Sequence, residues 1–154
     1  MTRSGIEVRK AKKADAPRMV EIMEANNHFY HPVVDGHESI ARQLTMENNV
    51  ILVAETENKV VGFVLGTWDG ARAFLFKMSV HPKFQRRGIG TMLVRAAAKA
   101  FRKMGAVTMG LSAADGTMGE ANNSVQFWEK LGFEQIPARL MINFELDKLL
   151  EAEE

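Results

Sequence analysis

The residues with the clearest chemistry lie in one short segment, 84–91, which reads FQRRGIGT. Two glycines, Gly88 and Gly90, follow a pair of arginines and precede an apolar pattern of helical period. The first turn of a helix presents unpaired N–H groups and the positive end of the helix dipole. Because glycine lets a ligand approach the backbone closely, this segment predicts a cradle for a pyrophosphate.

The segment matches neither of the two common phosphate-binding sequences. A nucleoside triphosphate loop ends in Gly-Lys-Ser or Gly-Lys-Thr, and the chain contains no such run. The dinucleotide fingerprint G-x-G-x-x-G fails because Leu93 stands at its last position. A glycine pair before a helix is also a common structural cap. The segment alone therefore leaves the ligand open.

Charge is distributed unevenly along the chain, although 20 basic and 19 acidic residues give a net charge of only +1. The stretch 70–114 holds nine basic residues and no acidic one, which leaves the remainder with a net charge of −8. Such segregation produces a positive field over part of the surface and suits a polyanionic ligand. A nucleic acid and a phosphorylated cofactor both fit. Part of the charge is also explained as the solvated face of a helix.

The composition is that of one ordinary globular domain. The chain has 154 residues, 46% hydrophobic and 25% charged, and we expect a single domain over 1–154 with its core at about 6–145. It contains no cysteine, so thiolate metal sites and a cysteine nucleophile are excluded, and the four histidines show no metal-ligand spacing. No apolar run is long enough to span a membrane, and the first residues do not resemble a signal peptide. We expect a cytoplasmic protein without metal.

The elements that must position the glycine segment form one mixed sheet with helices. Apolar periodicity and turn residues predict strands at 6–10, 50–55, 60–68, 71–80 and 107–111, and helices at 15–26, 38–47, 88–104 and 124–131. We expect 107–111 to be buried, 27–36 to be a loop, and 133–145 to form a pair of strands broken near Pro137. The predicted fold class is α/β (α+β), with a mostly antiparallel sheet flanked by helices.

The order of these elements gives the segment a specific context. A strand ending in Met78-Ser79-Val80-His81-Pro82, followed by Gln85-Arg86-Arg87-Gly88-Ile89-Gly90 and a long helix, resembles the acyl-CoA-binding motif of the GCN5-related N-acetyltransferase (GNAT) superfamily. Gln85, Gly88 and Gly90 match the three fixed positions of the pattern Gln/Arg-x-x-Gly-x-Gly/Ala. The run 124–133, which ends in Gly-Phe, resembles the closing helix of that family.

The resemblance implies a site for acetyl-CoA as acyl donor. Backbone groups of Met78 and Val80 would bind the pantetheine arm, and the strand ending at Val80 would splay from 107–111 to admit it. The remaining residues that the resemblance assigns to this cosubstrate are Ser79, the amides of Gln85, Arg86, Arg87, Gly88, Ile89 and Gly90, the Thr91 hydroxyl, Asn122 or Asn123, and Trp128.

The implied reaction is direct attack of a neutral amine on the thioester within a ternary complex. It needs a base for the ammonium, a donor for the oxyanion and an acid for the thiolate. Backbone N–H groups near Val80 satisfy the second need. Many relatives place a tyrosine acid where this chain has Trp128, whose indole is not a useful acid. Tyr30, the only tyrosine, is the candidate acid or substrate contact, and its alternative role is that of a packed loop aromatic. Because Ser112 replaces a glutamate found in some relatives, Glu120 is the candidate base, with a water relay to a more distant group as the alternative.

The sequence thus predicts an N-acetyltransferase whose acceptor is a primary amine on a small molecule or a protein. The net charge of −8 outside the basic stretch favours a cationic acceptor. One alternative is a CoA-binding sensor without turnover, to which Trp128 and Ser112 give support. A nucleic-acid-binding domain is a second alternative, but the chain has no stacking run of aromatic residues. A homodimer is compatible with the sequence.

Overall fold

The computed structural model describes residues 2–3, 5–28, 30–117 and 123–151. Its centre is a six-stranded sheet in which the strands follow one another in chain order. All neighbours are antiparallel except β5 and β6, which are parallel. The strands are β1 (Thr2–Arg3), β2 (Ile6–Lys10), β3 (Asn49–Thr56), β4 (Lys59–Trp68), β5 (Ala73–Val80) and β6 (Met109–Leu111).

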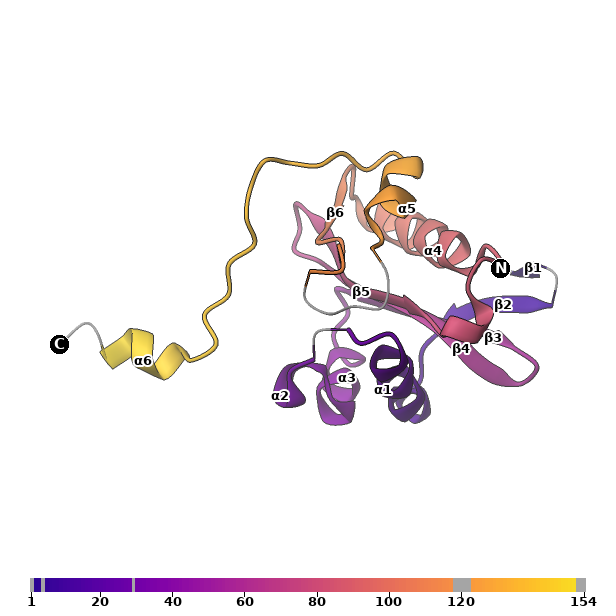
Figure 1. Ribbon diagram of the computed structural model, residues 1–154, viewed down its shortest axis with the longest axis horizontal. Coiled ribbons are helices and arrows are strands. Elements are labelled where there is room, and N and C mark those ends of the chain that lie inside the picture. Colours follow the sequence, from indigo (N-terminus) through magenta and orange to yellow (C-terminus); the bar gives the residue numbers. More distant parts are fainter. Residues whose placement is uncertain (1, 4, 29, 118–122, 152–154) are drawn as a thin grey trace.

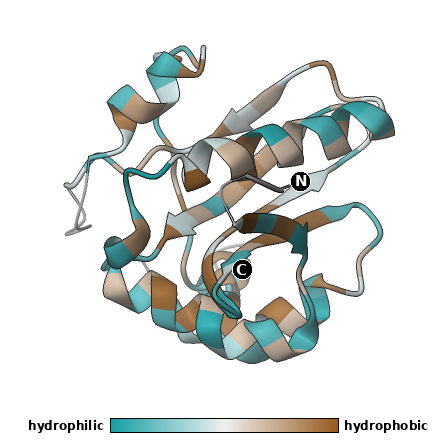
Figure 2. Cartoon of the chain, turned by 90° about the vertical axis from the view of Figure 1, so that its right-hand side faces the viewer, coloured by the Kyte–Doolittle hydropathy of each residue, from teal (hydrophilic) through white to brown (hydrophobic). Residues whose placement is uncertain are grey.

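Helices cover both faces of this sheet. Helices α1, α2 and α3 lie on one face, and α4 and α5 lie on the other (Figure 1). In Figure 2 the strands are seen between these two helical layers. The helices are α1 (Ala16–Ala25), α2 (Pro32–Asp35), α3 (His37–Gln43), α4 (Ile89–Met104), α5 (Val125–Lys130) and α6 (Leu146–Glu151), with 3₁₀ turns η1 (Lys13–Asp15) and η2 (Pro82–Phe84).

The core has two halves because side chains alternate across the sheet. On β4, Phe63 enters the cluster that packs against α1, and Val64 enters the cluster that packs against α4. The apolar stripe of α4 supplies Leu93 and Phe101, which are 0% and 1% exposed. The mixed sheet between two helical layers confirms the predicted fold class.

Local signals in the sequence place several elements correctly. The β3–β4 hairpin turns at Glu57 and Asn58, both with positive φ, as a two-residue hairpin requires. Helix α4 ends at Gly105, whose φ of 116° lies in the left-handed region. Asp15 stands at the expected N-cap of α1, but its carboxylate accepts from the Lys12 N–H and from Arg9 rather than from the helix.

Three expectations from the sequence are wrong. The segment 27–36 is not all loop, because α2 lies within it. The expected buried strand at 107–111 is only Met109–Leu111, and Val107 is 92% exposed. The described chain also forms no strand pair at 133–145. That segment instead extends away from the sheet and its helices and ends in α6 (Figure 1).

The model also bears on membrane insertion. Among the residues it describes, none of the helices has the length and apolar character that a membrane-spanning segment needs.

Candidate functional site

The glycine segment forms the entry to α4, as the sequence predicts. Gly88 is the residue before the helix, with φ 80° and ψ 7°, a conformation that glycine adopts without strain. No described side chain caps the α4 N-terminus. The N–H groups of Ile89, Gly90 and Thr91 therefore lie at the first turn of a 16-residue helix, where the helix dipole favours an anion.

The end of β5 presents a second set of backbone groups. The His81 N–H donates to the Val61 carbonyl at 2.8 Å, and Val80 is the register partner of Gly62. Antiparallel partners alternate between hydrogen-bonded and non-hydrogen-bonded pairs. The backbone groups of Met78 and Val80 therefore point away from β4, whereas those of Ser79 face β4.

The backbone groups of Met78 and Val80 face the side of β5 on which β6 lies. Strand β6 pairs with β5 from Ala73 to Leu75, and in the described chain their register ends there, five residues before Val80. The pairing of the two parallel strands thus ends before β5 reaches the start of α4, which agrees with the expected splay.

A buried network of polar side chains holds the end of β5. Asn26, at the end of α1, donates from Nδ2 to the Ser79 hydroxyl and to the Val80 carbonyl, both at 2.8 Å. Gln85 Nε2 donates to the same carbonyl at 2.9 Å and to Asn26 Oδ1 at 3.1 Å. His28 Nε2 is hydrogen-bonded to the Ser79 hydroxyl at 2.9 Å. Asn26 and Ser79 are 5% and 3% exposed.

This network shows what the side chains of Gln85 and Ser79 do, and it adds Asn26 to the residues of the site. Gln85, which the motif singles out, donates from its side chain to the Val80 carbonyl and so helps to hold the end of β5. The Ser79 side chain and backbone are both engaged inside the protein, so any contact with a cosubstrate is left to its neighbours. Sequence reasoning missed Asn26, because its partners lie 53 and 54 residues away and no local pattern signals them.

The loop between β5 and α4 is basic and exposed. Arg86 has φ 65°, and both Arg86 and Arg87 are exposed. The Arg87 guanidinium lies over the Phe84 ring, 5.0 Å from its centroid, which holds one cation beside the glycines. His81 Nδ1 accepts from the Lys83 N–H at 3.2 Å. Partial burial, with Arg18 and Lys83 nearby, lowers the pKa of His81.

Helix α5 closes over the start of α4. A Cβ on Gly90 would lie 3.2 Å from Phe127 Cζ, so Gly90 also allows α5 to pack closely. Trp128 is 6% exposed and packs edge-on against Phe127 and Phe133, with ring centroids 5.0 and 5.3 Å apart. Its ring is part of the core, and its contact with a cosubstrate stays a prediction.

The other predicted residues are placed as follows. The Ile89 side chain is 1% exposed, so only its N–H can serve the site, and Thr91 lies half-buried in the first turn of α4. Asn123 Oδ1 accepts from the Val125 N–H at 3.0 Å and so begins α5. Glu120 and Asn122 lie outside the described residues.

Tyr30 lies away from the glycine loop, in a hollow between α2 and α3. Its hydroxyl would be 3.3 Å from a Cβ on Gly36, and His37, Glu38 and Arg42 also line the hollow. An ion pair between Asp35 and Lys77, 3.9 Å apart, joins α2 to β5. The hollow therefore belongs to the face of the sheet opposite α4. The structure does not place Tyr30 against Val80.

Comparison with known proteins agrees with this geometry. The model of the acetyltransferase (GNAT) family matches residues 16–133. Acetyltransferase SG1711 of Sodalis glossinidius is 26% identical over 97% of this chain and 99% of its own. Acetyltransferase plu1384 of Photorhabdus laumondii is 34% identical over 58% of this chain, a match that spans only 62% of that protein.

A solved structure shows the same fold. PaiA N-acetyltransferase from Thermoplasma acidophilum, in complex with coenzyme A, superposes with a TM-score of 0.73 at 18% identity, over 87% of this chain and 92% of that one. The fold and the site define an acyltransferase that uses a CoA thioester. The chain belongs to the GNAT family of acetyltransferases. It is an acyl-CoA-dependent N-acetyltransferase.

The residues present fit the acyl-CoA that this family uses. The α4 N–H groups and the arginines suit a pyrophosphate, and the outward groups of Met78 and Val80 suit an extended amide arm. Among the described residues, His, Asp and Glu side chains do not gather in threes as a metal site would need.

Proposed function

We propose that this protein transfers an acetyl group from acetyl-CoA to a primary amine by direct attack in a ternary complex. The observation that carries the proposal is the pair of backbone donor sets, at the end of β5 and at the first turn of α4. Residues 1–154 would form one domain that works in the cytoplasm.

The two donor sets divide the work. The N–H groups of residues 88–91, with Arg86 and Arg87, would hold the pyrophosphate. Met78 would hold the pantetheine arm. The bound cosubstrate supplies an activated thioester. The Val80 N–H, which lies at the end of β5 that Asn26 and Gln85 hold, would stabilise negative charge on the thioester oxygen.

Proton transfer is assigned to two candidates. Tyr30 would act as acid or acceptor contact from the hollow beside α2, and Glu120 would act as base. The acceptor is a small molecule or a protein with a cationic amine, because the chain outside 70–114 carries a net charge of −8.

A panel of amines with acetyl-CoA, followed by release of free thiol, tests the reaction. Turnover with at least one primary amine supports the proposal. Saturable binding of acetyl-CoA without thiol release for any amine would instead indicate the CoA-binding sensor, whose support is the burial of Trp128 in place of an acid. Tyr30→Phe should lower kcat with little change in the Kd of acetyl-CoA. An unchanged kcat would remove Tyr30 from proton transfer.

Gly88→Ala tests the phosphate cradle against a matched control. A Cβ at Gly88 would stand at the entry of the helix, and we expect acetyl-CoA affinity to fall at least about tenfold, or about 1.4 kcal/mol. Gly105→Ala imposes similar left-handed strain, of about 1–2 kcal/mol, at the other end of the same helix. Gly105→Ala should lower the Tm and leave the affinity unchanged. Equal affinity losses in both variants would refute the cradle.

A further inference from the structure

The outer face of α4 carries cations without any acidic residue between them. Four exposed basic side chains recur at the three- and four-residue spacing of one helical face. They lie on the side of the helix away from Leu93, Ala97 and Phe101, which pack into the core. This set, here called the α4 stripe, consists of Arg95, Lys99, Arg102 and Lys103.

None of the described acidic side chains pairs with the α4 stripe. On the neighbouring helix α5, Glu129 accepts from Gln135 Nε2 at 3.2 Å. Like charges four residues apart on a helix repel each other. An anion bound along the stripe would therefore relieve a repulsion that the described chain leaves in place. The ion pairs of the described chain engage basic residues on other elements, namely Arg9, Arg18, Arg72, Lys77 and Lys148.

Bound acyl-CoA would use only the N-terminal end of this helix. Its pyrophosphate would lie at the first turn of α4, whereas Lys103 is about 22 Å farther along the helix axis than Gly88. From Arg95 to Lys103 the stripe spans about 12 Å, which is the axial length of roughly four phosphates on one strand of a nucleic acid duplex. The stripe therefore presents its cations to an anion longer than the pyrophosphate of the cosubstrate.

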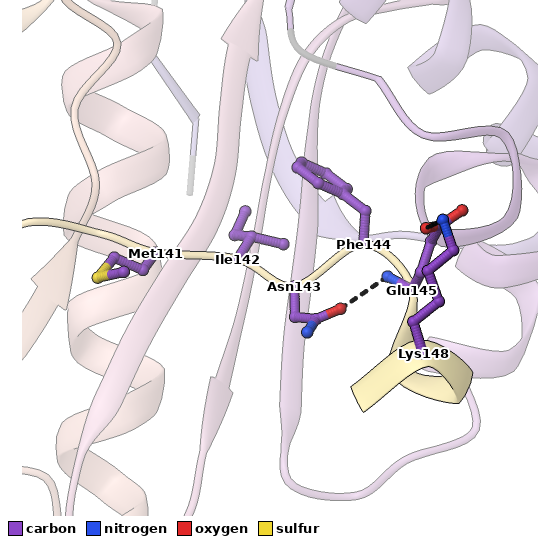
Figure 3. Close-up of a pocket in the computed structure, with 6 residues that line it drawn as sticks. All are labelled: Met141, Ile142, Asn143, Phe144, Glu145 and Lys148. Carbon is purple, nitrogen blue, oxygen red and sulfur yellow. Dashed lines mark hydrogen bonds and ion pairs between the residues drawn. The ribbon is translucent and has the colours of Figure 1, made fainter. Parts of the chain in front are cut away.

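The chemistry of this face favours a phosphate backbone over an acidic protein surface. Protein interfaces place apolar and aromatic anchors at their centre. Within the span of the stripe, the only exposed apolar residue is Ala98. Exposed apolar side chains gather instead around Ile142 and Phe144, which line a shallow hollow on another part of the chain (Figure 3). A duplex backbone needs cations and hydrogen-bond donors, and it needs no stacking aromatic side chain.

We propose that the α4 stripe binds the phosphate backbone of a nucleic acid duplex, DNA or RNA, without reading its sequence. Each of the four cations would contact a phosphate, and the duplex would lie along the outer face of α4, beyond the groups assigned to acyl-CoA. This inference goes beyond acetyl transfer and does not depend on it.

Fluorescence anisotropy with labelled DNA and RNA duplexes of about 20 base pairs provides the first test. For DNA, the logarithm of the binding constant should fall with the logarithm of salt concentration at a slope of about −3.6, because each of four phosphate contacts contributes about −0.9. Removing two contacts in Lys99→Gln/Arg102→Gln should reduce the slope to about −1.8 and lower the affinity at least about tenfold in about 50 mM salt.

A second double variant controls for net charge. Lys13→Gln/Arg139→Gln removes the same two charges at exposed positions outside the stripe, and it should leave both the slope and the affinity unchanged. Binding of either duplex with this pattern supports the proposal, and the duplex bound more tightly identifies the source of the phosphates. No saturable binding of either duplex in about 50 mM salt, or equal losses in the two double variants, would overturn the proposal.

Competition separates the stripe from the acyl-CoA site and from an acidic protein partner. Saturating acetyl-CoA should leave the duplex bound, whereas its displacement would place the duplex on the glycine segment and overturn the proposal. Polyglutamate that binds more tightly than either duplex would assign the stripe to an acidic protein and would equally overturn it. Lys99→Gln/Arg102→Gln should keep the wild-type Kd for acetyl-CoA, so loss of duplex binding and failure of acetyl transfer are measured independently.

Discussion

Replacing Asn26 with leucine should loosen the end of β5 without leaving a buried polar group alone. The substitution removes three hydrogen bonds, to the Ser79 hydroxyl, the Val80 carbonyl and Gln85 Nε2. The Val80 carbonyl keeps its bond from Gln85, and Ser79 keeps its bond with His28. The cost is therefore the net value of the lost bonds, about 1 kcal/mol each and about 3 kcal/mol together.

Thermal unfolding followed by circular dichroism measures this cost. For a chain of this size, about 3 kcal/mol corresponds to a fall in Tm of about 6–12 °C. Because Asn26 helps to hold the end of β5, which carries the Val80 N–H, acetyl-CoA affinity measured by titration calorimetry should also fall, by about tenfold.

Asn48 provides a matched control for Asn26. Its Nδ2 also donates to a hydroxyl and a carbonyl, those of Thr67 and Trp68, each at 3.1 Å, but it is exposed and lies at the far end of β4. Asn48→Leu should cost less than about 1 kcal/mol and leave the affinity unchanged. If Asn26→Leu and Asn48→Leu have the same Tm and the same affinity for acetyl-CoA, the buried network does not position the site.

Three further predictions concern stability. Gly66→Ala would bring a Cβ to 2.6 Å from the Phe74 carbonyl oxygen. This clash should lower the free energy of unfolding, measured by urea titration, by at least about 2 kcal/mol. A change below about 0.5 kcal/mol would show that the sheet adapts. Asp15→Asn removes the charge that pairs with Arg9 and should lower the free energy of unfolding by about 1.5–3 kcal/mol in the same titration. Glu21→Gln, in an exposed ion pair with Arg18, should lower it by less than about 1 kcal/mol. Equal losses in the two variants would contradict the structure. The pKa of His81 lies below its usual 6.5, so the unfolded chain binds this proton more tightly, and stability should fall as pH drops from 6.5 through the lower folded value. A His81→Gln variant, which cannot gain this proton, should lose less stability over that pH interval, and identical pH profiles would exclude His81 as the source.

The elements nearest the site could be predicted because their signals are local. The apolar stripe and terminal glycines of α4 specify a helix wherever it packs, and the hairpin residues Glu57 and Asn58 specify their own turn. The motif from Met78 to Gly90 likewise places its backbone groups through short-range geometry, so most of the candidate cosubstrate site follows from one contiguous stretch.

The remaining features depend on contacts that no short segment encodes. Asn26 meets β5 only after α1 packs on the sheet. The strand pair expected at 133–145 is absent from the described chain, because the apolar character of a segment does not say which sheet edge would receive it. Val107 was expected to be buried because it is uncharged, yet it lies beside an edge strand where burial requires a neighbour.

Amide chemical shifts provide the most direct measurement of where acyl-CoA binds. Acetyl-CoA added to the ¹⁵N-labelled protein should shift the N–H signals of Val80, Gly88, Ile89, Gly90 and Thr91 most strongly. Signals from α3 and from the β3–β4 turn should stay in place. Saturable shifts centred on any other part of the sheet, or none at millimolar acetyl-CoA, would contradict the assignment of these backbone donors.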